Sequence, residues 1–342
     1  MKLYEKIKNN EVYFIAEMSA NHAGRLENAL EIVKEAAKAG ADCLKIQTYT
    51  ADTITLDCDN EYFQIRTGLW KGYKRYDLYK EAYTPWDWQP AIKKECEKYG
   101  LDFLSTPFDK TAVDFLEDMQ VEFYKIASFE LVDIPLLKYT ASKGKPIILS
   151  CGLASAGEIK EAVDAIESMG NHNIVLLKCC SEYPADYNDM NLLTIADMKQ
   201  RFNYPVGLSD HSMGYIAGVT GAVIGADVIE KHFCLSRKIK NPDSEFSMEP
   251  DEFKALVDNV NLARRIRGKV TYDRTEKEEN SAHSRRSIFA SKDIAVGDKF
   301  SEENCCVVRP ADGLKPKYYE QLIGKTSKRM IKRGEPLNES DL

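Results

Sequence analysis

The sequence predicts an α/β fold, a (β/α)8 TIM barrel followed by a small β-rich domain. Before residue 270, short apolar runs alternate eight times with amphipathic stretches, a pattern typical of β/α units. The runs are continuously apolar, as expected of parallel strands that are buried on both faces. A doubly wound sheet is the main alternative, but no glycine-rich phosphate loop follows the first run.

The predicted elements follow one another along the whole first part of the chain. The eight strands are Val12–Glu17, Cys43–Gln47, Asp102–Thr106, Phe123–Ile126, Ile147–Ser150, Ile174–Lys178, Val206–Ser209 and Val228–His232. Helical periodicity between them predicts Leu26–Ala39, Pro90–Tyr99, Ala112–Met119, Ile134–Lys143, Ile159–Met169 and Leu192–Phe202. Several helices end near a glycine, such as Gly40 and Gly100, which marks their C-termini.

The character of the sequence changes near residue 270, which predicts a domain boundary. Residues 1–270 form the predicted barrel, since such a barrel needs about 250 residues. Residues 271–284 are strongly polar and predict a linker. Residues 285–342 contain short β-like runs and turns around Gly297 and Gly334, so we expect a small β-rich domain there. This domain is near the lower size limit for independent folding, so we expect it to pack against the surface of a partner.

Composition excludes several classes of function. The chain of 342 residues has 47 basic and 54 acidic residues, which argues against nucleic acid or an anionic membrane as a main partner. It has no apolar run of about 20 residues and no signal-peptide pattern at its start, so we expect a cytoplasmic protein. Its nine cysteines include no C-x2-C pair, and we interpret them as reduced thiols in the core.

Polar side chains stand at the C-terminal end of nearly every predicted strand, where a barrel builds its active site. One such residue alone usually satisfies a loop backbone group, whereas eight strand ends together indicate a functional site. Lys45 and Lys125 come from different strands and would converge on one pocket. Lysines are costly to bury without an anion, and nearby Ser and Thr hydroxyls add donors for a phosphate or carboxylate.

His211 and His232 are the candidate metal ligands. They end neighbouring predicted strands at equivalent positions, so their rings could meet over the barrel mouth. Imidazole suits Mn, Fe, Co or Zn, and two protein ligands leave coordination positions open for substrate and water. The alternative, which the spacing leaves open, is that each histidine binds only a strand-end backbone group.

The motifs IAEMSANHAG, KIQTYTADTITLD, FLSTPFD, YKIASFE, GLSDH and IEKHF resemble, in order and spacing, the barrel of the sialic acid (N-acetylneuraminate) synthase family. The segment RRSIFASKDIAVGD and the later VVRPADGL resemble the C-terminal antifreeze-like (SAF) domain of that family. The resemblance covers essentially the whole chain. Within the family, GLWKGYKRYDLYKEAYTPWDW is similar to the pseudaminic acid synthase branch, and it could line the sugar pocket.

The resemblance implies roles for individual residues. His211 and His232 would hold a divalent metal, Mn2+ or Mg2+, and Glu17 would orient or activate water. Phosphoenolpyruvate would be bound by Lys45, Thr106, Lys125, Ser128, Ser150 and Ser209. The amino sugar would be held by Gln47, Glu130, Tyr183 and Asp243, and by Arg309 from the other subunit of a domain-swapped homodimer. Glu182 departs from the family pattern and should repel an anion, so we expect it either to turn away from the anion or to alter the pocket.

The reaction implied is an aldol-like condensation of phosphoenolpyruvate with the open-chain sugar, assisted by the metal as a Lewis acid. Within the family, N-acetylneuraminate or legionaminate synthesis is the alternative to pseudaminate synthesis. A pyruvate-dependent aldolase on the same barrel is a more distant alternative. A non-catalytic sugar-binding protein, in which the small domain is the working part, is a fourth.

Overall fold

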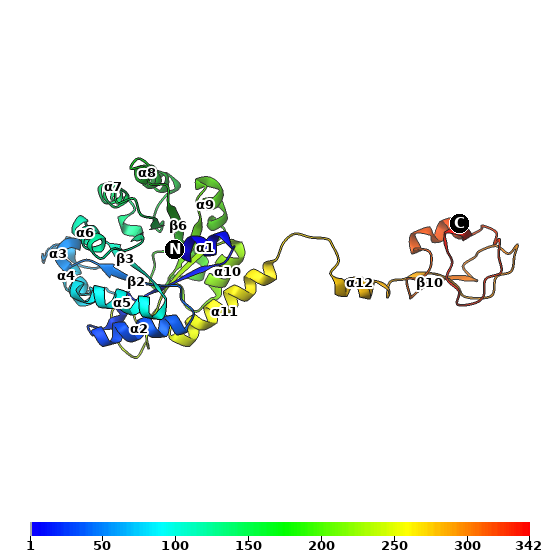
Figure 1. Cartoon of the computed structure of the whole chain (residues 1–342), viewed down its shortest axis with the longest axis horizontal. Coiled ribbons are helices and arrows are strands. Elements are labelled where there is room, and N and C mark those ends of the chain that lie inside the picture. The colour runs from blue at the N-terminus through cyan, green and yellow to red at the C-terminus, as the bar shows by residue number, and fades with distance from the viewer. Residues whose placement is uncertain (1) are drawn as a thin grey trace. The chain divides into compact units, whose positions relative to one another are not determined.

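The computed structural model describes residues 2–342, which form two compact units. One unit ends at Gly268, and the other comprises Lys269–Leu342. In the first unit, eight parallel strands lie inside a ring of helices (Figure 1). The strands are β1 (Tyr13–Glu17), β2 (Cys43–Thr48), β3 (Asp102–Pro107), β4 (Tyr124–Ile126), β5 (Ile147–Ser150), β6 (Ile174–Cys179), β7 (Val206–Asp210) and β8 (Val228–His232).

The strand order confirms the predicted barrel. It runs β3-β2-β1-β8-β7-β6-β5-β4, with every hydrogen-bonded neighbour parallel. The order leaves β3 and β4 at its two ends without a ladder between them in the described part of the chain, so the barrel is nearly closed. Each predicted strand agrees with an observed one to within one residue at either end.

Helices surround the strands, and several of them lay outside the sequence prediction. They are α1 (Lys2–Lys8), α2 (Leu26–Lys38), α3 (Ala51–Ile54), α4 (Arg75–Ala82), α5 (Gln89–Tyr99), α6 (Lys110–Asp118), α7 (Ile134–Ala141), α8 (Ala156–Glu167), α9 (Thr194–Phe202), α10 (Ile216–Ile224) and α11 (Pro250–Arg267). Helix α10 was missed because its sequence, IAGVTGAVI, has no polar face and so gives no amphipathic signal.

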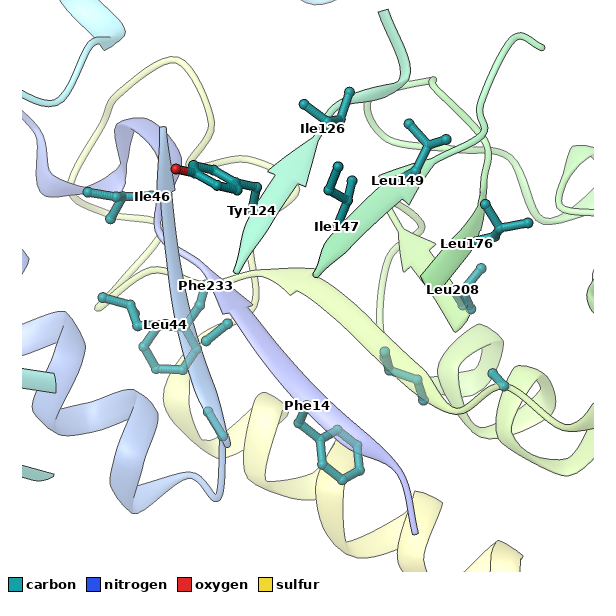
Figure 2. Packing of buried hydrophobic residues seen from close by; sticks show 14 of the residues in the cluster. Phe14, Leu44, Ile46, Tyr124, Ile126, Ile147, Leu149, Leu176, Leu208 and Phe233 are labelled. Carbon is teal, nitrogen blue, oxygen red and sulfur yellow. The ribbon is translucent and has the colours of Figure 1, made fainter. Parts of the chain in front are cut away.

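Alternation along each strand divides the hydrophobic core into two layers. Side chains that point outward pack beneath the helices (Figure 2), namely Phe14, Leu44, Ile46, Tyr124, Ile126, Ile147, Leu149, Leu176 and Leu208. Side chains that point inward fill the barrel interior, including Tyr13, Ile15, Leu104, Ile148 and Val228. Leu3 of α1 joins this inner layer. The interior is therefore apolar in its N-terminal half, and only its C-terminal half remains for polar groups.

The second unit has its own small core around a two-stranded antiparallel sheet of β9 (Ser287–Ala290) and β10 (Cys305–Val308). Ile288, Phe300 and Leu337 are among the buried members of that core. The unit also contains α12 (Glu276–Ala282) and α13 (Tyr319–Leu322). Helix α12 falls inside the range predicted as a linker, and a capping box of Thr275 with Glu278 begins it.

Among residues 2–342, no helix is both long and apolar enough to cross a membrane. All nine cysteines are free thiols. Seven of them belong to the barrel unit, and five of these seven are buried. Most cysteines of this unit therefore pack inside the fold.

Candidate active site

The register of the strands brings the predicted site residues to one level of the barrel. Glu17 at the end of β1 lies beside Lys45 of β2 and His232 of β8. Ser209 of β7 lies beside Glu230 in the same way. These side chains share the inward face of their strands, because the alternating outward residues belong to the outer core. The polar ring therefore sits directly above the apolar interior.

Four buried charges occupy the centre of this ring, and we call Glu17, Lys45, Lys125 and Glu230 the charged quartet. Lys45 Nζ lies 2.7 Å from Glu17 Oε2 and 3.4 Å from Glu230 Oε1. Lys125 Nζ lies 3.9 Å from Glu230 Oε2. Each of the four side chains is at most 5% exposed. Two cations and two carboxylates thus balance one another in a site that excludes bulk water.

Hydroxyl groups surround the quartet as the sequence predicted. Lys125 donates to Ser150 Oγ at 2.6 Å, and Lys45 Nζ lies 3.5 Å from Thr106 Oγ1. Ser209 Oγ lies 3.4 Å from Glu230 Oε1. Ser128 stands slightly apart and accepts a hydrogen bond from the backbone N–H of Gly152 at 3.0 Å. Two ammonium groups with several hydroxyl and amide donors form a site suited to a small anion.

Burial and mutual attraction set the pKa values of the quartet. Burial disfavours the charged form of Glu230, but Lys125 and Lys45 outweigh it and hold the pKa of this carboxyl below its usual value. Burial likewise opposes charge on Lys45, yet Glu17 and Glu230 raise its pKa. Burial raises the pKa of Glu17, and Glu230 adds to the effect against the attraction of Lys45. Glu17 is consequently the carboxylate of the pair that accepts a proton more readily.

His211 and His232 stand next to each other at the mouth, with ring centroids 5.4 Å apart. His211 Nδ1 lies 2.9 Å from the Cys180 carbonyl oxygen, so this nitrogen donates a hydrogen bond there and Nε2 is the atom that a metal would bind. Burial opposes charge on this ring, but Cys179 and the Cys180 carbonyl oxygen raise the pKa of His211, so a metal at Nε2 would replace a proton there. His232 Nδ1 is buried without a hydrogen-bond partner among the described residues. Burial, with His211 adding, holds the pKa of His232 well below its usual value, which keeps the metal-binding neutral form.

These features fit a divalent metal held by two imidazoles. Within residues 2–342, no group of three or more His, Cys, Asp or Glu side chains could hold an ion. Two imidazole ligands would leave the other coordination positions to substrate and water, as in an open catalytic site.

A cleft of about 1250 Å3 opens above the quartet and collects the residues predicted to hold the sugar. Its walls include Gln47, Glu130, Tyr183, His232 and Asp243. Gln47 Nε2 donates to Glu17 Oε1 at 3.0 Å and so joins the cleft to the quartet. Asp243 Oδ2 accepts the backbone N–H of Ala20 at 3.1 Å. Burial raises the pKa of Glu130 to about 7.

Two residues singled out from the sequence lie away from the charged quartet. Glu182 lies on the cleft wall with an exposed side chain, so its charge is solvated rather than buried beside the anion site. Arg309 belongs to the second unit, where its side chain is exposed. Its predicted contact with the sugar stays a prediction.

Sequence reasoning missed two members of the site. Glu230 bridges both lysines, and its signal was present in the strand pattern, since it lies two residues before His232 on the same face. Cys179 ends β6 with Sγ 3.8 Å from His211 Nδ1. Burial opposes ionisation of this thiol, but His211 and the hydroxyls of Ser181 and Ser128 lower its pKa to about 7. From the sequence we predict it only as one of the reduced thiols of the core.

Comparison with known proteins agrees with this geometry. The sequence matches the NeuB family over residues 32–272 and the SAF domain over residues 285–342. It is 46% identical to the pseudaminic acid synthase of Campylobacter jejuni over 97% of each chain, and 36% identical to that of Helicobacter pylori over 96% of this chain and 97% of the relative. A crystal structure of N-acetylneuraminic acid synthetase from Leptospira borgpetersenii superposes with a TM-score of 0.72 at 33% identity, covering 80% of this chain and 90% of that one.

Proposed function

The chain belongs to the NeuB family, and from this premise we propose that it is a pseudaminic acid synthase. It condenses phosphoenolpyruvate with 2,4-diacetamido-2,4,6-trideoxy-β-L-altropyranose to give pseudaminate and phosphate. It is thus a transferase that forms a carbon–carbon bond. The observation that carries the proposal is the charged quartet of Glu17, Lys45, Lys125 and Glu230 beneath an open cleft. This arrangement offers a buried place for a small anion and a roomy one for a sugar.

The quartet explains how phosphoenolpyruvate is held. Without an anion, Lys45 and Lys125 are neutralised by Glu17 and Glu230. A phosphate or carboxylate that enters replaces the glutamates as the partner of the two lysines. It also accepts hydrogen bonds from the hydroxyls of Ser150 and Thr106. In a buried site these contacts are stronger than in water and are already oriented before the substrate arrives.

Glu17 is the proton acceptor of the proposed reaction. Carbon 3 of phosphoenolpyruvate attacks the sugar aldehyde and forms the new carbon–carbon bond, which leaves positive charge at carbon 2. The electron pair of the broken carbonyl π bond moves to the aldehyde oxygen, which takes up a proton from solvent and becomes a hydroxyl. Water adds at carbon 2 and gives its proton to Glu17, whose pKa burial has raised and whose Oε1 is oriented by Gln47. The hydroxyl on the tetrahedral carbon 2 then loses its proton and becomes the carbonyl of a ketone, while the carbon–oxygen bond to phosphate breaks and phosphate leaves with the electron pair. The carboxylates of Glu17 and Glu230 also stabilise the transient cation.

We propose that the enzyme uses Mn2+ or Mg2+, held by His211 and His232. When bound, such an ion supplies a Lewis acid for the aldehyde oxygen of the sugar. Tyr183 supports this pair, since its ring centroid lies 4.2 Å from that of His211 and 6.2 Å from that of His232. The neutral state of His232 and its unpartnered Nδ1 support the assignment.

A domain-swapped homodimer and a cytoplasmic location complete the proposal. The second unit buries a core of its own, while Arg309 extends from it with an exposed side chain. An arginine that reaches the sugar from a partner subunit would use that side chain. Nine free thiols among the described residues suit a reducing compartment.

Phosphate release tests the proposed function. The purified protein is incubated with Mn2+, phosphoenolpyruvate and either the 6-deoxy diacetamido altrose or N-acetylmannosamine. We expect release with the altrose sugar and little with N-acetylmannosamine. Release with N-acetylmannosamine alone would assign the chain to N-acetylneuraminate synthesis. No release with either would contradict the proposal.

A further inference from the structure

Residues 64–74, between α3 and α4, fold back on themselves beside the cleft, and we call them the lid hairpin. An antiparallel bridge pairs Gln64 with Lys74, and Ile65 exchanges two backbone hydrogen bonds of 2.9 Å with Tyr73 and Gly72. Gly72 has a positive φ of 95°, a conformation that favours glycine at this turn. The hairpin is therefore held by its own backbone hydrogen bonds, although it belongs to none of the strands or helices of the barrel.

Ion pairs hold the base of the lid hairpin. Lys74 Nζ lies 2.5 Å from Asp57 Oδ1 and 2.7 Å from Asp59 Oδ1. The two aspartates belong to the preceding chain segment on the same side of the cleft. Because both aspartates are largely exposed, these ion pairs add only weak support to the base of the hairpin.

Trp70 holds the far end of the lid hairpin on the opposite side. Its indole N–H donates to the Pro242 carbonyl oxygen at 3.0 Å, in the loop that follows β8. Its ring centroid lies 5.5 Å from that of Tyr183, in the loop that follows β6. Through Trp70, the hairpin therefore spans the cleft. The loops that follow β2, β6 and β8 are in contact with one another there.

The order of the aromatic rings indicates which part of a sugar meets Trp70. The Tyr183 ring contacts both Trp70 and His211, the latter with ring centroids 4.2 Å apart, and so links Trp70 to the histidine pair. The reacting aldehyde belongs beside His211 and His232. Trp70 stands one ring farther out, at the place expected for the other end of a six-carbon chain.

We propose that Trp70 is a specificity-determining residue whose ring covers carbon 6 of the sugar and selects a methyl group over a hydroxymethyl group. This inference rests on the proposed function. The same hairpin lines the cleft with the apolar Ile65 and Leu69 and with the polar Gln64, Arg66 and Thr67, so selection for a methyl group is assigned to the Trp70 ring itself. The indole N–H is already bound to Pro242, so it has no donor left for an added hydroxyl. A methyl group covered by the ring gains from leaving water, whereas a hydroxyl that faces the ring finds no partner on the ring itself.

The test compares the 6-deoxy diacetamido altrose with the same sugar bearing a 6-hydroxyl group. For Trp70→Ala, we expect the ratio of the two kcat/KM values to fall at least about tenfold, because differences of one methyl-sized group are worth that much in a fitted pocket. The KM for phosphoenolpyruvate should stay within about twofold, since the quartet lies beneath the cleft. Trp70→Phe keeps a ring but loses the N–H, so it should retain most of the selectivity.

Tyr73→Ala is the matched control, because Tyr73 is an exposed aromatic residue of the same hairpin that does not line the cleft. It should leave the ratio unchanged. An unchanged ratio in Trp70→Ala, with both sugars still turned over, would overturn this inference alone. Wild-type protein that turns over neither sugar would overturn the proposed function and this inference with it.

Discussion

Asp210 and Lys231 form a buried ion pair of 2.8 Å between β7 and β8. Each is followed in the chain by one of the two histidines of the mouth, His211 or His232. Strand alternation puts the pair on the outer face of the barrel and the histidines on the inner face. On the outer face, the ion pair therefore links the two strands that present the imidazoles on the inner face.

Loss of this pair should destabilise the barrel. Removing one partner of a buried ion pair leaves an uncompensated charge, which costs about 3–5 kcal/mol. We expect Lys231→Met to lower the free energy of unfolding by that amount, measured by urea denaturation, and to weaken Mn2+ binding in calorimetry. Lys254→Met is the control, since Lys254 pairs with Asp258 at an exposed site worth about 0.3–0.5 kcal/mol. Equal effects of both variants would contradict the account.

Glu17→Gln should separate catalysis from binding. The amide keeps the shape of the side chain but cannot take a proton from water, so we expect kcat to fall by about 10²–10⁴. Phosphoenolpyruvate should still bind, because Lys45, Lys125 and the hydroxyls remain. The measurements are steady-state kinetics and calorimetric titration with phosphoenolpyruvate. Comparable losses in kcat and in affinity would show that Glu17 only holds the quartet together.

Stability should depend on pH through Glu130. Burial raises its pKa to about 7 from an ordinary 4.5, against the attraction of Lys125 and with Asp133 adding to the rise. The folded protein thus holds this proton more tightly than the unfolded chain does. Its contribution to stability is complete below about pH 4.5 and is lost as the pH rises through about 7. Between pH 4.5 and 8 the unfolding midpoint of the wild type should fall relative to that of Glu130→Gln, whose amide does not titrate. A difference between the two midpoints that stays constant from pH 4.5 to 8 would refute the assigned role of Glu130.

Gly152 has no room for a side chain. A Cβ there would lie 2.2 Å from Ser181 Oγ and 2.8 Å from Ser128 Oγ. Gly152→Ala should therefore displace Ser128 and raise the KM for phosphoenolpyruvate by at least about tenfold. Gly157→Ala is the control, because its Cβ would meet nothing closer than 3.8 Å. An unaltered KM in Gly152→Ala would mean that Ser128 takes no part in anion binding.

The barrel could be predicted because its signals are local. Each strand is a short apolar run, and the residues at its end follow from alternation, which is why Glu17, Lys45 and Lys125 were anticipated together. Helix α12 was missed inside a polar stretch, although the Thr275 capping box was visible in the sequence. Its polar composition outweighed that signal in our interpretation.

The rest depends on contacts between distant segments. Glu230 was overlooked as a site residue because its importance comes from Lys45 and Lys125, on strands far away in the chain. The hydrogen bond from Trp70 to Pro242 joins residues 172 positions apart, and neither local sequence contains a pattern that predicts it. The pairing of Asp210 with Lys231 likewise became visible only with the register of β7 and β8.

The most direct test of the central claim is a competition experiment. The protein receives phosphoenolpyruvate, Mn2+ and equal concentrations of the 6-deoxy diacetamido altrose and N-acetylmannosamine, and the nine-carbon acids formed are identified by mass spectrometry. The account predicts the diacetamido trideoxy acid, pseudaminate, as the dominant product, formed together with one phosphate per molecule. Formation of N-acetylneuraminate as the dominant product would contradict it.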